Sequence, residues 1–353
     1  MRKLTTLVLA AFLMISLTLV GCNNSSSNAA KAPKEVLQEA FTKSTEVTSS
    51  KFEGTMTLNL ELPESALDDP AAAMVLNMLN SAELQIRGTS QLDPMMAEMF
   101  ITVRVTGDTE MAINLSLLMT EEKMWVKIPN TPFLPLPEEM IGKYLELDFQ
   151  ELSEFSGEEI DFSNQGEYQE LGIEIMEIFF SAFEEDEYFS AVSKEEVELP
   201  DNVDVDQVIK FELTNDNLRP FVKSLIEVLP EIIEKLSEID NAGITQAEID
   251  AIKEEIEAGK EDIDSAMDEI EEMVSINKAE ILTGINKDGY LTYTGLDLSV
   301  DVTEDGETGT FGFTFDMTQS EINQDPEFEI SEPSEDDSIS FMDFMSQMML
   351  SGM

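Results

Sequence analysis

The sequence predicts an α+β fold with a mostly antiparallel sheet. Runs of alternating apolar and polar residues occupy 52–128 and 281–317, and much of the stretch between them has apolar residues at helical spacing. Two strand runs separated by helices favour this class, because a parallel sheet alternates single strands with single helices. With 42% hydrophobic residues, the chain can bury a core.

The N-terminus resembles the signal peptide of a bacterial lipoprotein. Arg2 and Lys3 precede an uncharged, mainly apolar stretch that ends in Leu19-Val20-Gly21-Cys22, a sequence similar to the lipobox. The resemblance implies that residues 1–21 are removed and that the Cys22 thiol carries a diacylglycerol. Two acyl chains give stable attachment, so the protein is expected at the extracytoplasmic face of the cell membrane. A transmembrane anchor is the alternative, for which the apolar run is slightly short.

The charge of the chain is extremely acidic. Asp and Glu number 74 against 20 Lys and Arg, which gives a formal net charge of −54. Such a surface repels nucleic acid and anionic headgroups, so no nucleic-acid partner is expected. Solubility or adaptation to a salt-rich or cation-rich envelope explains the charge, a specific cationic partner is the alternative, and the sequence identifies no protein partner.

Catalysis is not expected. The chain has no histidine, and lipidation of Cys22 would use its only thiol, so the commonest general base, zinc ligand and nucleophile are missing. The single cysteine also excludes a disulfide within the chain. Hydrolysis by paired carboxylates stays formally open, but 74 acidic residues make no pair distinctive and Trp125 is the only tryptophan for sugar stacking. No P-loop or dinucleotide motif is present, so no cofactor is expected.

Two segments contain residue types that bind cations. Asp201, Asp204 and Asp206 could hold a hard cation, although an acidic surface turn explains them equally well. Asn286-Lys287-Asp288-Gly289 is similar to part of a calcium-binding loop, but glycine occupies both positions that require an acidic residue. A tight hairpin turn is predicted there instead, and no metal site is expected.

The first half of the chain is predicted to contain a tether, a helix and a run of strands. Strict alternation from Phe52 to Leu62 makes the first strand the clearest, and Pro63 ends it. The expected elements are a flexible tether at 22–34, a helix at 33–47, strands at 52–62, 84–90, 101–105, 111–119 and 124–128, a helical insertion at 65–80 and a proline-rich loop at 130–137.

The second half is predicted to contain helices followed by strands. A helical hairpin is expected at 219–274, with a turn at Asn241-Ala242-Gly243 and a capping box of Thr245 and Glu248 at its second arm. Residues 35–333 are therefore expected to form a single domain with this hairpin inserted. The other expected elements are a helix at 173–191, a strand at 208–213, and strands from Ile281, at 291–302 and at 308–317.

Residues 334–353 are expected to form an acidic, largely disordered tail that contains a short amphipathic segment. Ser340 could cap a helix there, but so short a helix is marginal in water and should form only when docked on the protein, a partner or a membrane. One helical face would carry Phe341, Phe344, Met345, Met348 and Met349.

Apolar residues gather on one face of the predicted strands. They could fill a core or line a cavity for an apolar ligand, and methionine suits irregular apolar cavities. The candidate ligand residues are Met56, Leu58, Leu60, Met111, Ile113, Leu115, Met124, Val126, Phe311, Phe313 and Phe315.

The pattern from Pro33 to Pro333 resembles the LolA/LppX-like lipoprotein superfamily, and most closely its Gram-positive branch of largely uncharacterised lipoproteins. The features that carry the resemblance are the lipobox and tether, one helix, long strands from Ser50, a strand at 123–127 and a last strand at 313–318. The resemblance implies a strongly curved antiparallel half-barrel, covered by helices, around an apolar cavity. The helical hairpin and the acidity depart from the family, which offers no catalytic residues to carry over.

These observations lead to an expected function. The chain should be a membrane-tethered extracytoplasmic lipoprotein that binds a lipid or acyl chain in a half-barrel cavity. The alternative is a surface adaptor or scaffold lipoprotein that carries no ligand because its core is filled.

The lipobox predicts the effect of replacing its cysteine. We expect Cys22→Ala to leave the precursor uncut by the lipoprotein peptidase or to release the protein from the membrane, because no thiol remains to accept the lipid. Membrane fractionation with mass spectrometry of the N-terminal peptide measures this. Unchanged membrane association of a wild-type chain whose Cys22 is unmodified would contradict it.

Overall fold

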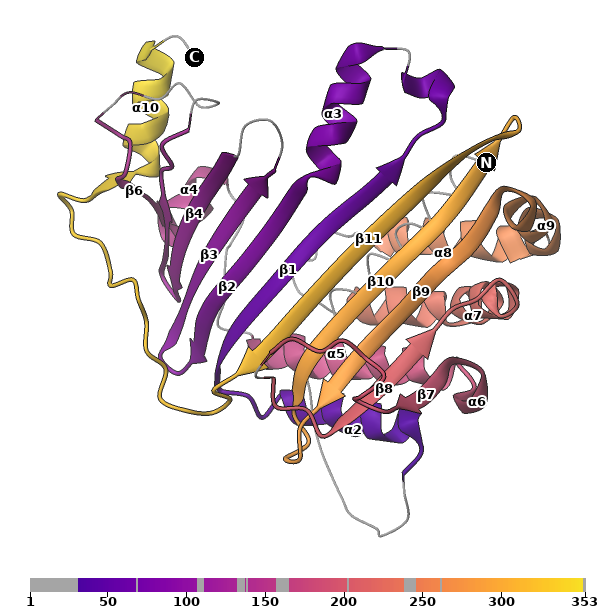
Figure 1. Cartoon of the computed structure of the whole chain (residues 1–353). Coiled ribbons are helices and arrows are strands. Elements are labelled where there is room, and N and C mark those ends of the chain that lie inside the picture. Colours follow the sequence, from indigo (N-terminus) through magenta and orange to yellow (C-terminus); the bar gives the residue numbers. More distant parts are fainter. Residues whose placement is uncertain are drawn as a thin grey trace. The chain divides into compact units, whose positions relative to one another are not determined.

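The computed structural model describes residues 31–67, 69–106, 111–131, 137, 139–156, 165–201, 203–237, 246–260 and 262–351. Cys22 and most of the tether lie outside these residues. The described part contains nine α-helices and twelve strands, in one mostly antiparallel sheet that does not close into a barrel (Figure 1). The predicted α+β class is therefore confirmed. The strand order is β12-β6-β5-β4-β3-β2-β1-β11-β10-β9-β8-β7.

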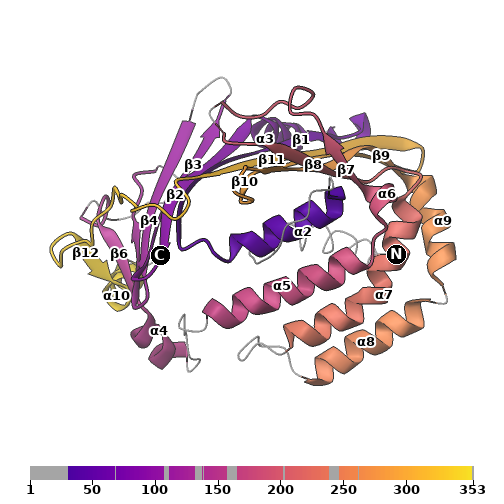
Figure 2. The ribbon, with the colours of Figure 1, turned by 90° about the horizontal axis from the view of Figure 1, so that it is seen from below.

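The chain divides into two compact units. The first comprises 1–47 and 164–293, and the second comprises 48–163 and 294–353. The first unit contains α2 (Pro33–Ser44), α5 (Gln165–Ser181), α6 (Glu185–Tyr188), β7 (Phe189–Val192), β8 (Gln207–Glu212), α7 (Leu218–Leu236), α8 (Gln246–Lys260), α9 (Ile263–Met273), β9 (Val274–Ile285) and the first residues of β10 (Leu291–Glu304). Figure 2 shows α2, α5, α7 and α8 following one another as neighbours.

Aromatic side chains form the core of the first unit. Phe183 is buried and stacks on Phe221 of α7, with ring centroids 4.8 Å apart. Tyr188 stacks on Phe211 of β8 at 5.9 Å, and its burial raises the pKa of the phenol to about 12. These contacts tie the helices to the strands beneath them, and each ring pair adds to the energy of burial.

The predicted helix at 173–191 is wrong at its C-terminal end. Helix α5 ends at Ser181, and Phe189–Val192 forms the strand β7, which pairs antiparallel with β8. The apolar residues of this segment fit both periods over so short a length, so long-range pairing decided between them. Similarly, β9 begins at Val274, earlier than the predicted start at Ile281.

The segment predicted as a helical hairpin lies between β8 and β9, which pair antiparallel. Its second arm is divided into α8 and α9 rather than continuous. Gly259 adds no side chain to the apolar residues of this arm, and glycine is a poor helix former. Helix α8 ends one residue later, at Lys260. The predicted turn at 241–243 and Thr245 lie outside the described residues.

The tight turn predicted at Asp288-Gly289 is confirmed. The Asn286 Oδ1 atom accepts hydrogen bonds from the backbone N–H groups of Asp288 and Tyr290, each at 3.0 Å. Gly289 has a φ of +87°, a conformation that favours glycine. The turn therefore joins β9 to β10.

The second unit contains most of the sheet. Figure 1 shows its long strands side by side. Its elements are β1 (Ser49–Glu61), the 3₁₀ helix η1 (Glu64–Leu67), α3 (Pro70–Asn80), β2 (Ala82–Leu92), β3 (Met95–Val105), β4 (Met111–Thr120), β5 (Lys123–Lys127), β6 (Tyr144–Asp148), α4 (Phe149–Ser156), the remainder of β10, β11 (Glu307–Ser320), β12 (Ser338–Ser340) and α10 (Phe341–Ser351).

The C-terminal segment forms regular structure, which corrects the expectation of a largely disordered tail. Strand β12 pairs parallel with β6, and α10 follows it directly. The Ser340 Oγ atom accepts the Asp343 N–H at 3.1 Å, as a helix cap does. Phe341 also meets Phe155 of α4 edge to face at 6.4 Å. The segment is therefore ordered by docking on its own chain.

A buried carboxylate fastens the segment 321–333 to the sheet. Glu98 of β3 is buried, and its Oε2 atom accepts the backbone N–H groups of Glu329 and Ile330 at 2.8 and 2.9 Å. Ile330 then packs on Leu118 and Trp125. Two hydrogen bonds to a charged acceptor offset part of the cost of burying the carboxylate.

This attachment predicts that Glu98→Ala lowers the free energy of unfolding by about 1–3 kcal/mol, because two backbone N–H groups lose their acceptor. Urea unfolding followed by the fluorescence of Trp125 measures the loss. Glu98→Gln is the matched control, since it keeps an acceptor oxygen and should lose less. Equal losses for the two variants would contradict this role for Glu98.

Candidate functional site

The candidate ligand residues of β1 and β11 are direct neighbours across the two strands. Met56 pairs with Phe315, Leu58 with Phe313, and Leu60 with Phe311. Directly opposed residues of an antiparallel pair point to the same face of the sheet. The register therefore places three apolar pairs in a row on one face.

The same face continues through the neighbouring strands. Met56 is opposite Leu84 of β2, Leu84 is opposite Val103 of β3, and Val103 is opposite Ile113 of β4. Farther along, Leu117 of β4 is opposite Val126 of β5, and Met119 is opposite Met124. All the candidate ligand residues predicted from the sequence thus lie on one face of the sheet in the second unit. We call this face the apolar face.

The side chains of the apolar face are not packed as a closed core. Phe311 is 38% exposed, and the other candidate residues are half-buried. The opposite face of the same strands has a small closed core instead, in which Leu118, Trp125 and Ile330 are buried. The apolar face is therefore less completely buried than the smaller core on the opposite face.

Several members of the apolar face were not among the predicted ligand residues. The alternation within β2 and β3 was recognised, but the sequence did not reveal which of their faces joins that of β1. The pairings supply this information, and they also add the unpredicted strand β6, whose Leu145 is opposite Val126. The additional residues are Leu84, Ile86, Met99, Ile101, Val103, Val105, Leu117, Met119, Leu145 and Leu147.

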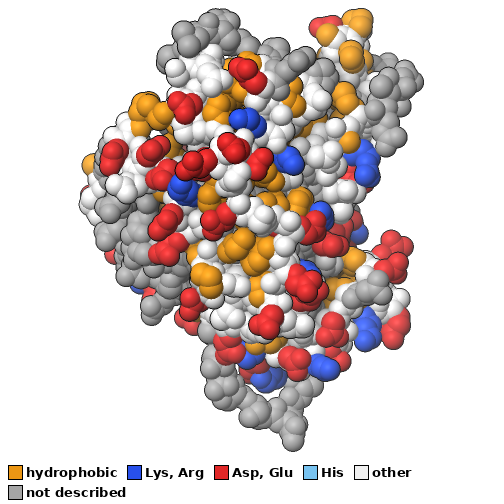
Figure 3. Space-filling model, turned by 90° about the vertical axis from the view of Figure 1, so that its left-hand side faces the viewer, with side chains coloured by type: hydrophobic (Ala, Val, Ile, Leu, Met, Phe, Trp, Pro, Cys, Tyr) orange, Lys and Arg blue, Asp and Glu red, His pale blue; other side chains and the backbone are white. Residues whose placement is uncertain are grey.

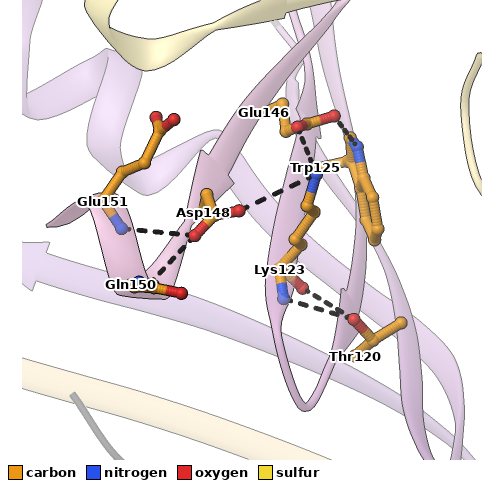
Figure 4. Close-up of polar contacts among 7 residues, drawn as sticks. All are labelled: Thr120, Lys123, Trp125, Glu146, Asp148, Gln150 and Glu151. Atoms are coloured by element: carbon orange, nitrogen blue, oxygen red, sulfur yellow. Dashed lines mark hydrogen bonds and ion pairs between the residues drawn. The ribbon is translucent and has the colours of Figure 1, made fainter. Parts of the chain in front are cut away.

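A polar network on the opposite face holds β5 against β6 (Figure 4). The two carboxylate oxygens of Glu146 accept hydrogen bonds from Lys123 Nζ at 2.6 Å and from Trp125 Nε1 at 2.9 Å. Lys123 Nζ also lies 3.8 Å from an Asp148 oxygen, and Asp148 accepts two backbone N–H groups at the start of α4. Because side chains alternate between faces, this register places Met124 and Val126 on the apolar face.

The electrostatics of this network favour its charged form. The hydrogen bond from Lys123 to Glu146, with a smaller attraction from Asp148, raises the pKa of Lys123 above its ordinary value. The Trp125 ring is buried, so its N–H group needs an acceptor, and Glu146 supplies it. The network thus links β5 to β6 at the edge of the apolar face.

The other predicted sites gain no structural support. Asp201, Asp204 and Asp206 are exposed, and no group of three or more Cys, Asp or Glu side chains in the described part of the chain could hold a metal ion. Cys22 lies outside the described residues. Figure 3 shows acidic side chains scattered over one side of the molecule with apolar patches between them.

Comparison with known proteins adds no family assignment. Neither a family model nor a curated protein matches the chain. Among the helices that the structure describes, none has the length and apolar character needed to cross a membrane. The features that bear on function are therefore the geometry of the apolar face and the N-terminal sequence.

The β5–β6 network predicts that Glu146→Ala lowers the free energy of unfolding by about 1–3 kcal/mol, because the buried Trp125 N–H loses its acceptor. Trp125 is the only tryptophan, so its emission should also shift if this edge loosens. The control, Glu121→Ala, removes an exposed carboxylate from the nearby β4–β5 turn. Unaltered stability and emission in Glu146→Ala would disprove the positioning role.

Proposed function

We propose that this chain is the precursor of an envelope lipoprotein that is tethered outside the membrane through Cys22 and binds an apolar ligand on the apolar face. The ligand class that fits best is a lipid, held by its acyl chain. The observation that carries the proposal is that strands β11, β1, β2, β3, β4 and β5 present apolar side chains in register without burying them fully.

The finer architecture is part of the same proposal. A wide apolar sheet face cannot remain open to water, so it must be covered by other elements or by a ligand. A strongly curved half-barrel covered by helices would supply both an enclosure and room for an acyl chain. This arrangement is the one implied by the resemblance to LolA/LppX-like lipoproteins.

The energetics favour an aliphatic ligand. Burial gives about 0.8 kcal/mol per methylene, so an acyl chain that buries about ten methylenes gains about 8 kcal/mol. The loss of translational freedom and the ordering of the chain oppose this gain. Methionine and leucine side chains in the apolar face adapt to a flexible chain better than to a rigid polar molecule, because they offer no directed hydrogen bonds.

The proposal includes binding without turnover. The candidate ligand residues offer no nucleophile, acid or base, and the polar groups at the β5–β6 edge of the apolar face are engaged with one another in the Glu146 network. The competing class is a carboxylate-based hydrolase that acts on wall polymer. Turnover of wall glycan that is abolished by one Asp or Glu substitution would defeat the proposal.

The direct experiment is native mass spectrometry, with lipid extraction, of the chain beginning at Asn23. We expect a co-purifying lipid that is lost in Leu115→Trp, because the larger ring would fill the space above the apolar face. Asn114→Trp is the matched control, since this exposed neighbour lies on the opposite face of β4 and should retain the lipid.

Two results would count against the proposal. A chain that carries no lipid and does not displace or bind a fluorescent fatty acid would favour the adaptor or scaffold function. Equal loss of lipid in Leu115→Trp and Asn114→Trp would show that binding does not depend on the apolar face.

A further inference from the structure

Helix α3 is an exposed apolar helix in an otherwise highly charged protein. From Pro70 to Ala82 the chain has no charged side chain, although 27% of all residues are charged. Met74 is 74% exposed, Val75 52% and Met78 44%, and no residue of the helix is buried. Exposed apolar side chains gathered in one place mark an interaction surface.

This helix is held firmly in place and is not a loose loop. The Asp69 side chain accepts the Ala71 N–H at 2.9 Å, and Pro70 begins the helix. At the other end, the Asn80 side chain bonds both the N–H and the C=O of Leu60, each at 2.7 Å. A helix of this length without ion pairs is marginal in water, so these contacts fix it with its apolar residues outward.

The exposed surface of α3 is continued by neighbouring elements at the same end of β1. Leu62, directly after β1, and Val302, near the end of β10, are exposed, as is Phe311. Ser65 of η1 is hydrogen-bonded to Glu307 of β11, which brings the α3 segment to the β10–β11 turn. Because Phe311 pairs with Leu60 on the apolar face, the exposed surface and the candidate ligand site meet at this point.

A second apolar helix projects from this end of the second unit. Figure 1 shows α3 and α10 both extending beyond the same end of the strands. Met342 and Met345 of α10 are exposed, and Asp343 is the only charged residue between Phe341 and Met353. Two separated helices with exposed methionines thus lie at this end of the second unit.

We propose that this end of the second unit, with α3 at its centre, inserts into the acyl region of a lipid bilayer and is where the ligand enters the apolar face. The entry step rests on the proposed function, whereas the bilayer contact rests on the exposed residues alone. At full extension the residues from Cys22 to Pro33 span about 40 Å, so the proposed lipid anchor at Cys22 would keep the protein close to a bilayer.

The charge around α3 favours a bilayer, rather than a second copy of the chain, as the partner of this exposed surface. Glu61, Asp69, Glu304 and Glu307 lie around the apolar residues, and the chain carries a net charge of −54. Two copies meeting at α3 would bring these carboxylates together, which is unfavourable. A bilayer of neutral headgroups carries no such opposing charge, whereas anionic headgroups should weaken the contact because Arg104, the basic residue at this end of β2 and β3, is paired with Glu83.

The test uses the lipid-anchored protein in vesicles of neutral phosphatidylcholine. Met74→Cys provides one site for an environment-sensitive thiol fluorophore, and wild-type protein treated identically is the labelling blank. We expect nitroxides on the lipid acyl chains to quench the probe strongly. Ile252→Cys on α8, which replaces an exposed apolar residue of the first unit, is the matched control and should be quenched little.

Two additions sharpen the result. Met78→Glu in the Met74→Cys background should remove most of the quenching, because it places a carboxylate in the inserted surface. Replacing part of the phosphatidylcholine with phosphatidylglycerol should weaken quenching at low salt and restore it at high salt, when like charges are screened.

The inference is overturned if the probe at residue 74 remains as accessible to water and as weakly quenched as the probe at 252. It is also overturned if the probe is shielded from water but not quenched, and copies cross-link through residue 74, which would show a dimer contact. Fatty-acid binding by the soluble chain is measured separately. Binding without insertion rejects only this inference, and insertion without binding rejects only the proposed function.

Discussion

The second unit depends on one constraint, which is the two-residue period of β-strands kept in register from β11 to β6. Each pairing, such as Leu58 with Phe313 or Leu117 with Val126, carries the apolar residues of one strand onto the face used by the next. A slip of one residue in any pair would turn the apolar side chains of that strand to the opposite face. The apolar face is therefore wide because the register is maintained across all these pairings.

The two faces of this sheet in the second unit differ in their polar contacts. One face carries the polar groups that hold the strands and the segment 321–333 in position, including Glu98 and Glu146. Hydrogen bonds suit this role because they are directional, and they therefore specify the register of the strands more sharply than apolar contacts do. The apolar face carries a polar cluster at one end, where Gln319 donates a hydrogen bond to Ser50 Oγ beside Ser90, at the opposite end of β1 from Leu60.

Much of this architecture could be predicted from the sequence, because the strands and helices show the repeating patterns of apolar residues that are typical of each. Alternation located the long strands, and the Asp288-Gly289 pair located a hairpin turn. The strand pairings place the candidate residues from Met56 to Phe315 on a common face. Short elements were missed, since the four-residue β7 and the three-residue β12 are too brief to show a period and exist only through pairing with β8 and β6.

The outermost strands of the sheet affect how readily one molecule can pair with another. A sheet that does not close leaves two rows of unpaired backbone groups, which can recruit strands of neighbouring molecules. Here the terminal strands are the two short ones, β12 and β7, and β12 leads directly into α10. These brief strands offer a poor template for growth, although β4 at 111–116 and β9 at 274–279 extend beyond the registers that pair them with β5 and β8. If the proposed lipid anchor confines the protein to a membrane plane, neighbouring molecules meet often, and brief terminal strands would then limit pairing between them.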